Sequence, residues 1–374
     1  MQQKFVQLAA PGVRDLHPYQ PGKPISELER EYGISGSVKL ASNENPLGPG
    51  EAALAAIKKA SQHIHLYPDG NGFYLKQALA KKHQVPVEAI TLGNGSNEVI
   101  MLAAETFLTS QHEAIYSQHG FAAYPIAVQA VGATARVVPA LGLDHPMRRG
   151  DDLNGFADRV TADTRLIFIA NPNNPTGTWL EAQRLKDFVA SMPAHVIVII
   201  DQAYFEYNDG AVYGDASLWI SEYPNLIVAR SFSKAYGLAG LRIGYCLSHP
   251  DVASLMNRVR LAFNTNELAQ AAALAALGAH DYLEKARQIN AAGLTRFTDF
   301  CDAHKISYCP SMGNFLLIDV QGDALPVYER LLRKGIIVRP VGGYGLPESL
   351  RISIGLPEEM DRLMSALPEV LELG

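Results

Sequence analysis

Lys234 is the residue of this sequence best placed to act as an amine nucleophile. It follows a short apolar run that is typical of a buried strand, inside the segment Ser231-Phe-Ser-Lys-Ala-Tyr-Gly-Leu-Ala-Gly-Leu-Arg242. A lysine held at the end of a buried strand can have a lowered pKa, which allows it to form a Schiff base or to carry a proton. Ser231, Ser233 and Arg242 add hydroxyl and guanidinium donors suited to a phosphate. An exposed lysine on a glycine-rich turn is the alternative interpretation of this segment alone.

Asp201 and Tyr204 follow another apolar run, Val196-Ile-Val-Ile-Ile200. The carboxylate of Asp201 could pair with a protonated ring nitrogen and keep a pyridinium charged, so that the ring can accept the electrons of a broken Cα–H bond. Tyr204 could donate a hydrogen bond to a phenolate-like ring oxygen. An aspartate after a strand is often only a helix N-cap. Asp201 and Tyr204 therefore indicate a cofactor site mainly because Lys234 is expected at the same edge of the sheet.

Two turns rich in glycine and asparagine add further polar groups. Gly93-Asn-Gly-Ser-Asn-Glu98 precedes an expected helix, so the backbone N–H groups of Gly95, Ser96 and Asn97 would face an anion at the positive end of the helix dipole. Asn171-Pro-Asn-Asn-Pro-Thr-Gly177 is a rigid turn whose Asn174 could direct its amide at a cofactor oxygen, although a turn without a ligand would have the same composition.

Two arginines near the C-terminus stand in strand-like segments. Arg339 lies in Val-Arg-Pro, and Arg351 alternates with the apolar residues of Leu350-Arg-Ile-Ser-Ile354. Alternation places Arg351 on the face opposite its apolar neighbours. Such an arginine is a surface charge if that face meets solvent, and a bidentate anion clamp if it faces a cleft.

Apolar runs of strand length alternate with helical patterns, which predicts a mostly parallel sheet covered by helices on both faces. We expect ligands outside the carboxyl ends of these strands, where the four polar segments fall. We expect an N-terminal arm and part of the small domain at 1–45, a large domain at 46–280 and a smaller C-terminal α+β domain at 281–374. The expected helices are Glu51–Ala60, Asn97–Leu108, Leu180–Ser191 and Asn266–Leu277, and the expected strands of the large domain are Ile90–Leu92, Ala114–Tyr116, Ala135–Val138, Arg165–Ala170, His195–Ile200 and Asn225–Arg230.

Composition excludes several other classes of protein. A formal net charge of -6 argues against a general nucleic-acid binder. No run reaches the roughly 20 apolar residues of a membrane span, and no secretion signal is visible, so we expect a cytoplasmic protein. Cys246, Cys301 and Cys309 have no metal-ligand spacing and are expected to be reduced thiols, and no metal site is expected.

Taken together, the motifs resemble those of the fold-type-I pyridoxal-phosphate aminotransferases, most closely the histidinol-phosphate aminotransferase family. The resemblance implies an α/β fold with a large domain, whose mostly parallel sheet is sandwiched by helices, and a smaller α+β domain. It covers nearly the whole chain. Its segments are His17–Gly22, Leu40–Gly48, Tyr67–Phe73, Gly93–Glu98, Asn171–Gly177, Asp201–Tyr207, Ser231–Arg242 and Leu350–Gly355.

The resemblance also implies roles for individual residues. Lys234 would bind pyridoxal 5′-phosphate covalently and then move a proton between the substrate and the cofactor, and Asp201 would pair with the ring nitrogen. Tyr204 and Asn174 would bond the ring oxygen, and Phe121 would stack on the ring. The cofactor phosphate would be held by Gly95, Ser96, Asn97, Ser231, Ser233 and Arg242, together with Tyr67 of a neighbouring subunit in a homodimer.

The implied substrates are histidinol phosphate and 2-oxoglutarate. The implied substrate contacts are Tyr19, Asn43, Tyr124, Asn174, Arg339 and Arg351. Two arginines and a tyrosine match a phosphate ester, which is a dianion, better than a single α-carboxylate. Paired arginines also occur in relatives that take carboxylates, so an aromatic amino-acid aminotransferase and a threonine-phosphate decarboxylase are alternatives. A non-catalytic cofactor-sensing domain would require a fused DNA-binding module.

The chain departs from the family pattern at two places. Gln202 replaces a frequent glutamate, and we expect its side chain to point away from the cofactor ring. Arg260-Leu-Ala-Phe-Asn264 lacks the usual proline in a region expected near the cleft, which leaves side-chain specificity open.

Overall fold

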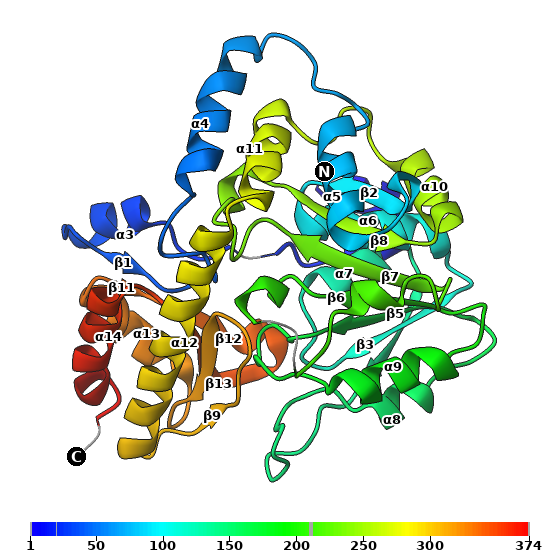
Figure 1. Cartoon of the computed structure of the whole chain (residues 1–374). Coiled ribbons are helices and arrows are strands. Elements are labelled where there is room, and N and C mark those ends of the chain that lie inside the picture. The colour runs from blue at the N-terminus through cyan, green and yellow to red at the C-terminus, as the bar shows by residue number, and fades with distance from the viewer. Residues whose placement is uncertain (1, 20, 209–211, 373–374) are drawn as a thin grey trace.

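A seven-stranded sheet forms the centre of the larger part of the molecule (Figure 1). The computed structural model describes residues 2–19, 21–208 and 212–372. The strand order is β2-β8-β7-β6-β5-β3-β4, and β8 alone runs antiparallel to its neighbours. The strands are β2 (Ile90–Gly93), β3 (Glu113–Ser117), β4 (Thr134–Val138), β5 (Thr164–Ala170), β6 (Ile197–Asp201), β7 (Leu226–Ser231) and β8 (Gly244–Ser248).

Helices cover both faces of this sheet, because alternate side chains of each strand point to opposite faces. In β5, Ile167 and Ile169 pack into one buried cluster, whereas Leu166 and Phe168 pack into another. Burying a side chain of this size contributes about 1.5–3 kcal/mol. The first cluster includes residues of α5 (Phe73–His83), α8 (Leu153–Ala157), α9 (Ala182–Ser191) and α11 (Glu267–Leu277), and the second includes residues of α6 (Gly95–Phe107), α7 (Ala123–Ala130) and α10 (Pro250–Val259).

Strand β8 was not expected from the sequence, and it shapes the site. Its first residue, Gly244, pairs with Gly93 of β2 and with Ser231 of β7. A Cβ atom on Gly244 would lie 2.8 Å from the backbone nitrogen of Ser96 and 2.7 Å from the carbonyl carbon of Gly95. A glycine is therefore required where the turn between β2 and α6 crosses the end of β8.

The C-terminal part contains a smaller antiparallel sheet of order β12-β13-β10-β9. The long helix α12 runs down from the large part and lies beside this sheet (Figure 1). The elements are β9 (Tyr308–Cys309), β10 (Phe315–Asp319), β11 (Ile336–Ile337), β12 (Arg339–Val341), β13 (Leu346–Ser353), α12 (His280–Ala303), α13 (Ala324–Arg333) and α14 (Pro357–Val370).

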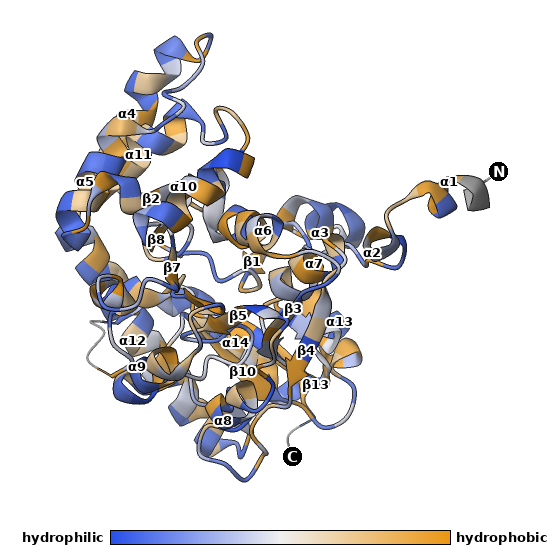
Figure 2. Cartoon of the chain, turned by 90° about the vertical axis from the view of Figure 1, so that its right-hand side faces the viewer, coloured by the Kyte–Doolittle hydropathy of each residue, from blue (hydrophilic) through white to orange (hydrophobic). Residues whose placement is uncertain are grey.

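The N-terminal segment joins the C-terminal part. Strand β1 (Val38–Lys39) pairs in parallel with β11, and Leu40 packs into the buried cluster around the small sheet. Helix α1 (Gln2–Leu8) stands away from the rest of the molecule, whereas α4 (Glu51–Ala60) packs along α11 (Figure 2). The remaining helical elements are α2 (Pro11–Arg14), α3 (Ile25–Tyr32), η1 (Ser61–His63), η2 (Val87–Ala89), η3 (Phe205–Tyr207), η4 (Ala216–Trp219), η5 (Ala239–Leu241) and η6 (Gly342–Tyr344). The domain division 1–45, 46–280 and 281–374 stays a prediction.

A buried arginine connects the two parts. The guanidinium of Arg149 donates to Asp319 at 2.5 Å and to Glu348 at 2.7 Å, and it is 6% exposed. Removing one partner of such a pair leaves an uncompensated buried charge, so the pair opposes a change in the relative position of the sheets. Within the described ranges, no helix has the length and apolarity needed to cross a membrane.

Candidate active site

A cavity of about 230 Å³ opens at the carboxyl ends of β2, β5, β6 and β7, where parallel strands end at one edge of the sheet. The segment 42–44 and strand β13 close it from the other side. The sequence-predicted residues that line it are Tyr19, Asn43, Gly95, Ser96, Asn97, Phe121, Asn174, Asp201, Tyr204, Ser231, Ser233, Lys234, Arg242 and Arg351. The structure adds Ser42, Glu44, Ala170, Pro172, Ala203 and Ala239 to this lining.

Lys234 lies inside the cavity just beyond the end of β7. Its Nζ atom donates to the carbonyl oxygen of Ser42 at 3.1 Å and lies 5.6 Å from the centroid of the Tyr204 ring. Burial lowers the pKa of this amine to about 7, and the guanidinium groups of Arg351 and Arg242 act in the same direction. A substantial fraction of Lys234 is therefore a neutral, nucleophilic amine at neutral pH.

This lowered pKa predicts how fast the cofactor-free protein captures an aldehyde cofactor. Below pH 7 most Lys234 amines carry a proton and cannot attack, so the rate should rise by about tenfold per pH unit and then level off above pH 7. The visible absorbance of the bound cofactor reports this rate in stopped-flow experiments. A rate that keeps rising beyond pH 9, as for an ordinary lysine, would contradict the assignment.

Asp201 is the buried carboxylate of the cavity. One of its oxygens accepts from the backbone N–H of Ala203 at 3.1 Å, and the other accepts from the hydroxyl of Tyr124 at 3.3 Å. Burial raises its pKa to about 6, although both hydrogen bonds and the charge of Lys234 act to lower it. An anion desolvated in this way is strongly stabilised by a cationic N–H that enters the cavity.

At the other end of the cavity lie several hydrogen-bond donors that together suit a dianion. Arg242 donates to the hydroxyl of Ser233 at 3.2 Å, and the backbone N–H of Ser233 donates to the hydroxyl of Ser231 at 3.0 Å. Helix α6 begins beside them at Gly95, whose φ is +76° and whose added Cβ would lie 2.8 Å from a guanidinium nitrogen of Arg242. A phosphate here would meet a helix N-terminus, hydroxyls and a guanidinium together.

Arg351 closes the cavity from the small sheet. It is 4% exposed, and its two terminal nitrogens donate to the side-chain oxygen of Asn174 and, at 2.7 Å, to the carbonyl oxygen of Ala41. Its Nε atom is buried and has no hydrogen-bond partner among the described residues. Beside it, Asn43 donates to the hydroxyl of Tyr204 at 2.9 Å. The guanidinium of Arg351 lines the cavity and has an N–H group without a partner among those residues, so it could bind an anionic ligand there.

Three sequence-predicted residues lie outside the cavity lining. Tyr67 is 81% exposed and stacks on Phe263 at 4.7 Å between ring centroids. Arg339 lies in an adjoining hollow, where its guanidinium is 5.4 Å from the ring of Tyr19, a residue shared by both hollows. Tyr124 is buried and donates to Asp201 at 3.3 Å, and its contact with the substrate stays a prediction.

The two departures from the family pattern also lie outside the lining. Gln202 points away from the cavity: its side-chain oxygen accepts from Arg230 at 2.9 Å, and its amide donates to the carbonyl of Gly214 at 2.9 Å. Arg260 donates to the carbonyl of Gly70 at 3.0 Å and so secures the segment that carries Tyr67. Within the described residues, no group of His, Cys, Asp or Glu is arranged to hold a metal ion.

Comparison with known proteins identifies the family in which this site occurs. Residues 35–367 match the model of the family described as aminotransferase class I and II. Histidinol-phosphate aminotransferase 1 of Nitrosococcus oceani is 52% identical over 368 residues, which cover 98% of both chains. The chain belongs to the class I and II aminotransferases.

Further relatives place the chain close to one branch of these aminotransferases. Histidinol-phosphate aminotransferase 2 of Pseudomonas aeruginosa is 51% identical over 369 residues, again with 98% of both chains covered. The crystal structure of histidinol-phosphate aminotransferase from Sinorhizobium meliloti in complex with pyridoxal-5′-phosphate superposes with a TM-score of 0.88 at 31% identity and 97% coverage of both chains. The predicted fold class, a fold-type-I α/β aminotransferase, is confirmed.

Proposed function

We propose that this protein is a pyridoxal-phosphate-dependent histidinol-phosphate aminotransferase. It would convert histidinol phosphate and 2-oxoglutarate to imidazole acetol phosphate and glutamate, in histidine biosynthesis. The observation that carries the chemistry is the buried Lys234 amine in one cavity with the Asp201 carboxylate and the Ser231, Ser233 and Arg242 donors. The substrate is inferred from the relatives that are 51–52% identical over nearly the whole chain.

The chemistry of the lining fits pyridoxal phosphate. Asp201 suits the protonated ring nitrogen, Tyr204 suits the ring oxygen, and Arg242 with the start of α6 suits the phosphate. When bound, the cofactor supplies an aldehyde that condenses with amines and a pyridinium ring that accepts the electron pair released at the substrate Cα.

The protein's own groups would orient the reactants and move the proton. Lys234 would hold the cofactor covalently, and once an amino donor has taken its place, its amine, whose pKa is lowered by burial, would take up and return the proton of the substrate Cα. Asp201 would hold the ring-nitrogen proton, and Tyr204, whose hydroxyl accepts from Asn43, would hold the ring oxygen. Phe121, which lines the cavity, would cover the ring and limit the access of water.

The substrate anion would bind at Arg351. Its buried guanidinium has an unpartnered Nε, and Tyr19 extends from the cavity toward Arg339 in the adjoining hollow. A phosphate ester offers more acceptor oxygens than a carboxylate, so it can engage Arg351 together with Tyr19 and Arg339. The same arginine would bind the α-carboxylate of 2-oxoglutarate or glutamate in the second half-reaction.

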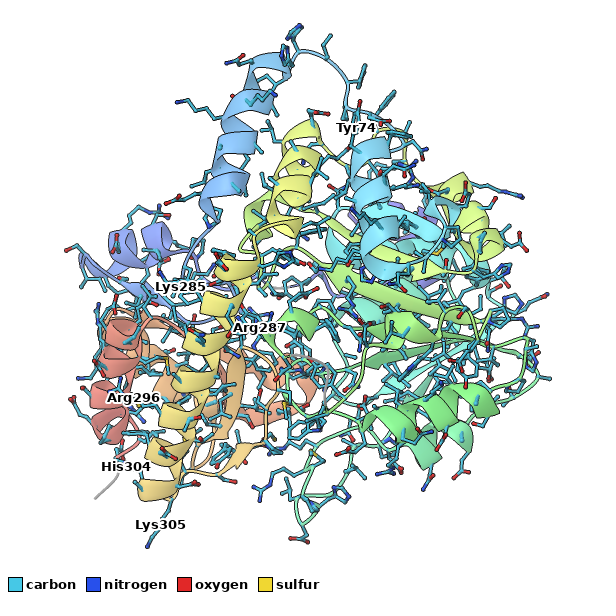
Figure 3. The ribbon with its side chains drawn as sticks, viewed as in Figure 1. Tyr74, Lys285, Arg287, Arg296, His304 and Lys305 are labelled. Carbon is cyan, nitrogen blue, oxygen red and sulfur yellow. The ribbon has the colours of Figure 1, made fainter. Side chains whose placement is uncertain are left out.

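We expect Arg351→Ala to weaken substrate binding far more than it slows the chemical step. The loss of a buried charge-assisted pair costs about 2–5 kcal/mol, so kcat/KM for histidinol phosphate should fall roughly 30-fold or more, mainly through KM. Steady-state kinetics measure this split. The matched control is Arg296→Ala: Arg296, labelled on α12 in Figure 3, is paired at the surface with Asp361 and should tolerate the change. An unchanged KM in Arg351→Ala would remove Arg351 from the substrate site.

Substrate preference tests the proposed activity as a whole. Histidinol phosphate, phenylalanine and tyrosine are mixed separately with the holoenzyme, and the loss of the visible absorbance of the Lys234-bound cofactor is followed for each. We expect histidinol phosphate to react with the largest kcat/KM. A faster reaction with phenylalanine would support the aromatic amino-acid alternative, and release of CO₂ from threonine phosphate would support the decarboxylase.

A cytoplasmic homodimer is part of the proposal. Tyr67 is exposed and lies outside the cavity lining of its own chain, and it stacks on Phe263, which is also exposed. Exposed apolar side chains in contact with each other suit an interface with a second copy. We propose that Tyr67 reaches the cofactor phosphate of the neighbouring subunit. Sedimentation of the holoenzyme tests the dimer, and a fully active monomer would contradict it.

A further inference from the structure

Tyr124 is a fully buried tyrosine placed directly behind the carboxylate of Asp201. It is 1% exposed, and its ring stacks on Phe168 with a centroid distance of 5.0 Å and meets Phe121 edge-on at 6.0 Å. This packing holds the ring in one orientation, so the direction of the hydroxyl is fixed by the core. The hydroxyl donates to Oδ2 of Asp201 at 3.3 Å.

The hydrogen bonds around Asp201 are few. Oδ1 accepts from the N–H of Ala203, and Oδ2 accepts from Tyr124, the one side-chain donor to this carboxylate among the described residues. Each carboxylate oxygen has more than one lone-pair site, so both oxygens keep capacity for a donor on the cavity side. The contact with Tyr124 also sets the rotation of the carboxylate, and with it the direction of the lone pairs that face the cavity.

We propose that Tyr124 is a positioning residue that keeps Asp201 an oriented carboxylate, so that the cofactor's ring nitrogen, and not Asp201, carries the shared proton. The inference rests on the proposed function, since it requires the pyridine ring to lie against Asp201. A hydrogen bond to an ionised acceptor stabilises the anion more than the protonated acid. Without this bond the proton moves toward Asp201, and the ring becomes a weaker electron acceptor.

Several other charged or titratable groups face this pair. Tyr204 and Lys234 act on Asp201, and Asp151 and Tyr204 act on Tyr124. Burial and the neighbouring Asp201 are the two largest causes that favour the protonated hydroxyl of Tyr124, and Asp151 adds a smaller effect in the same direction. The surroundings therefore raise the pKa of Tyr124 well above its ordinary value, and its role as a donor persists throughout the neutral range.

The test is the ¹⁵N resonance of ring-labelled pyridoxal phosphate in the holoenzyme, which distinguishes a protonated from an unprotonated ring nitrogen. In Tyr124→Phe, we expect the signal to move toward the unprotonated position at constant pH, and kcat to fall roughly tenfold with KM within about twofold. The control is Tyr116→Phe, because Tyr116 is a buried tyrosine of the neighbouring strand β3 that does not line the cavity.

A second variant retains the ring and changes only the hydroxyl. Incorporation of 3-fluorotyrosine at position 124 makes the hydroxyl a stronger donor, so the ¹⁵N signal should move toward the protonated position or stay fully there. An unmoved signal in Tyr124→Phe, with only a lower thermal midpoint, would overturn the inference. If the wild-type protein holds no labelled cofactor at Lys234, the proposed function fails instead, so the two failures are distinguishable.

Discussion

Replacement of Lys234 by alanine is expected to abolish transamination while leaving part of the cofactor binding. The amine is both the covalent attachment point and the proton carrier, and general acid–base catalysis alone contributes about 10²–10⁴-fold. We therefore expect kcat to fall by at least 10³-fold. The donors at Ser231, Ser233 and Arg242 remain, so the protein should still retain pyridoxal phosphate non-covalently.

Single-turnover kinetics with histidinol phosphate and equilibrium dialysis of the cofactor separate these two effects. The matched control is Lys285→Ala, since Lys285 is an exposed lysine of α12 that lies away from the cavity (Figure 3). Added small amines should restore part of the turnover of Lys234→Ala if the missing function is proton transfer. Normal turnover in Lys234→Ala would remove the lysine from the mechanism.

The second large effect is expected for Asp201→Asn. The amide occupies the volume of the carboxylate but carries no charge to hold a proton on the ring nitrogen, so the ring loses most of its ability to accept electrons. We expect kcat to fall by roughly 10²–10⁴-fold, with substrate KM little changed because Arg351 is untouched. Steady-state kinetics and retention of the cofactor after gel filtration provide the measurement.

Asp151→Asn is the matched control for this change. Asp151 is also a buried carboxyl whose pKa is raised to about 6 by burial, but it does not line the cavity. If both substitutions reduced kcat equally, the effect would reflect the loss of any buried carboxylate in this region and not a role in holding the ring. Retained activity in Asp151→Asn together with loss in Asp201→Asn supports the assigned role.

The positions of the site residues at the strand ends could be predicted, because a reactive polar residue directly follows an apolar run of strand length. Asp201 and Lys234 each follow a continuous apolar run, and parallel strands bring such positions to one edge of the sheet. The helix over Glu51–Ala60 is confirmed at both ends, and α6, α9 and α11 begin or end within two residues of the predicted bounds. The bounds of these helices follow from the local pattern of apolar and polar residues, which can be read from a single sequence.

Contacts made across long sequence separations were harder to predict. Ser42 accepts from Lys234 and Ala41 accepts from Arg351, because β1 and β13 bring the N-terminal segment over the cavity. The motif around Asn43 indicated the segment but not these backbone contacts. Strand β8 was not predicted, because its first residue, Gly244, follows a glycine-rich segment at once and no long apolar run marks it.

The case of Tyr124 shows a different limit of sequence reasoning. The resemblance implied a substrate contact for Tyr124, and the structure places its buried side chain outside the cavity lining, where it donates to Asp201. The motif places Tyr124 shortly after Phe121 along the chain, whereas the depth of its side chain depends on what packs over it, here Phe168 of β5. How deeply a side chain is buried depends on tertiary packing, about which the motif gives no information.

Chemical trapping of the cofactor tests the central claim most directly. The holoenzyme is reduced with borohydride, digested, and analysed by mass spectrometry for the lysine that carries the pyridoxyl group. Lys76 and Lys82 also have pKa values lowered by burial, but neither lines the cavity, so they are the informative competitors. The structure predicts the modification on Lys234, and modification of Lys76 or Lys82, or of no lysine, would contradict it.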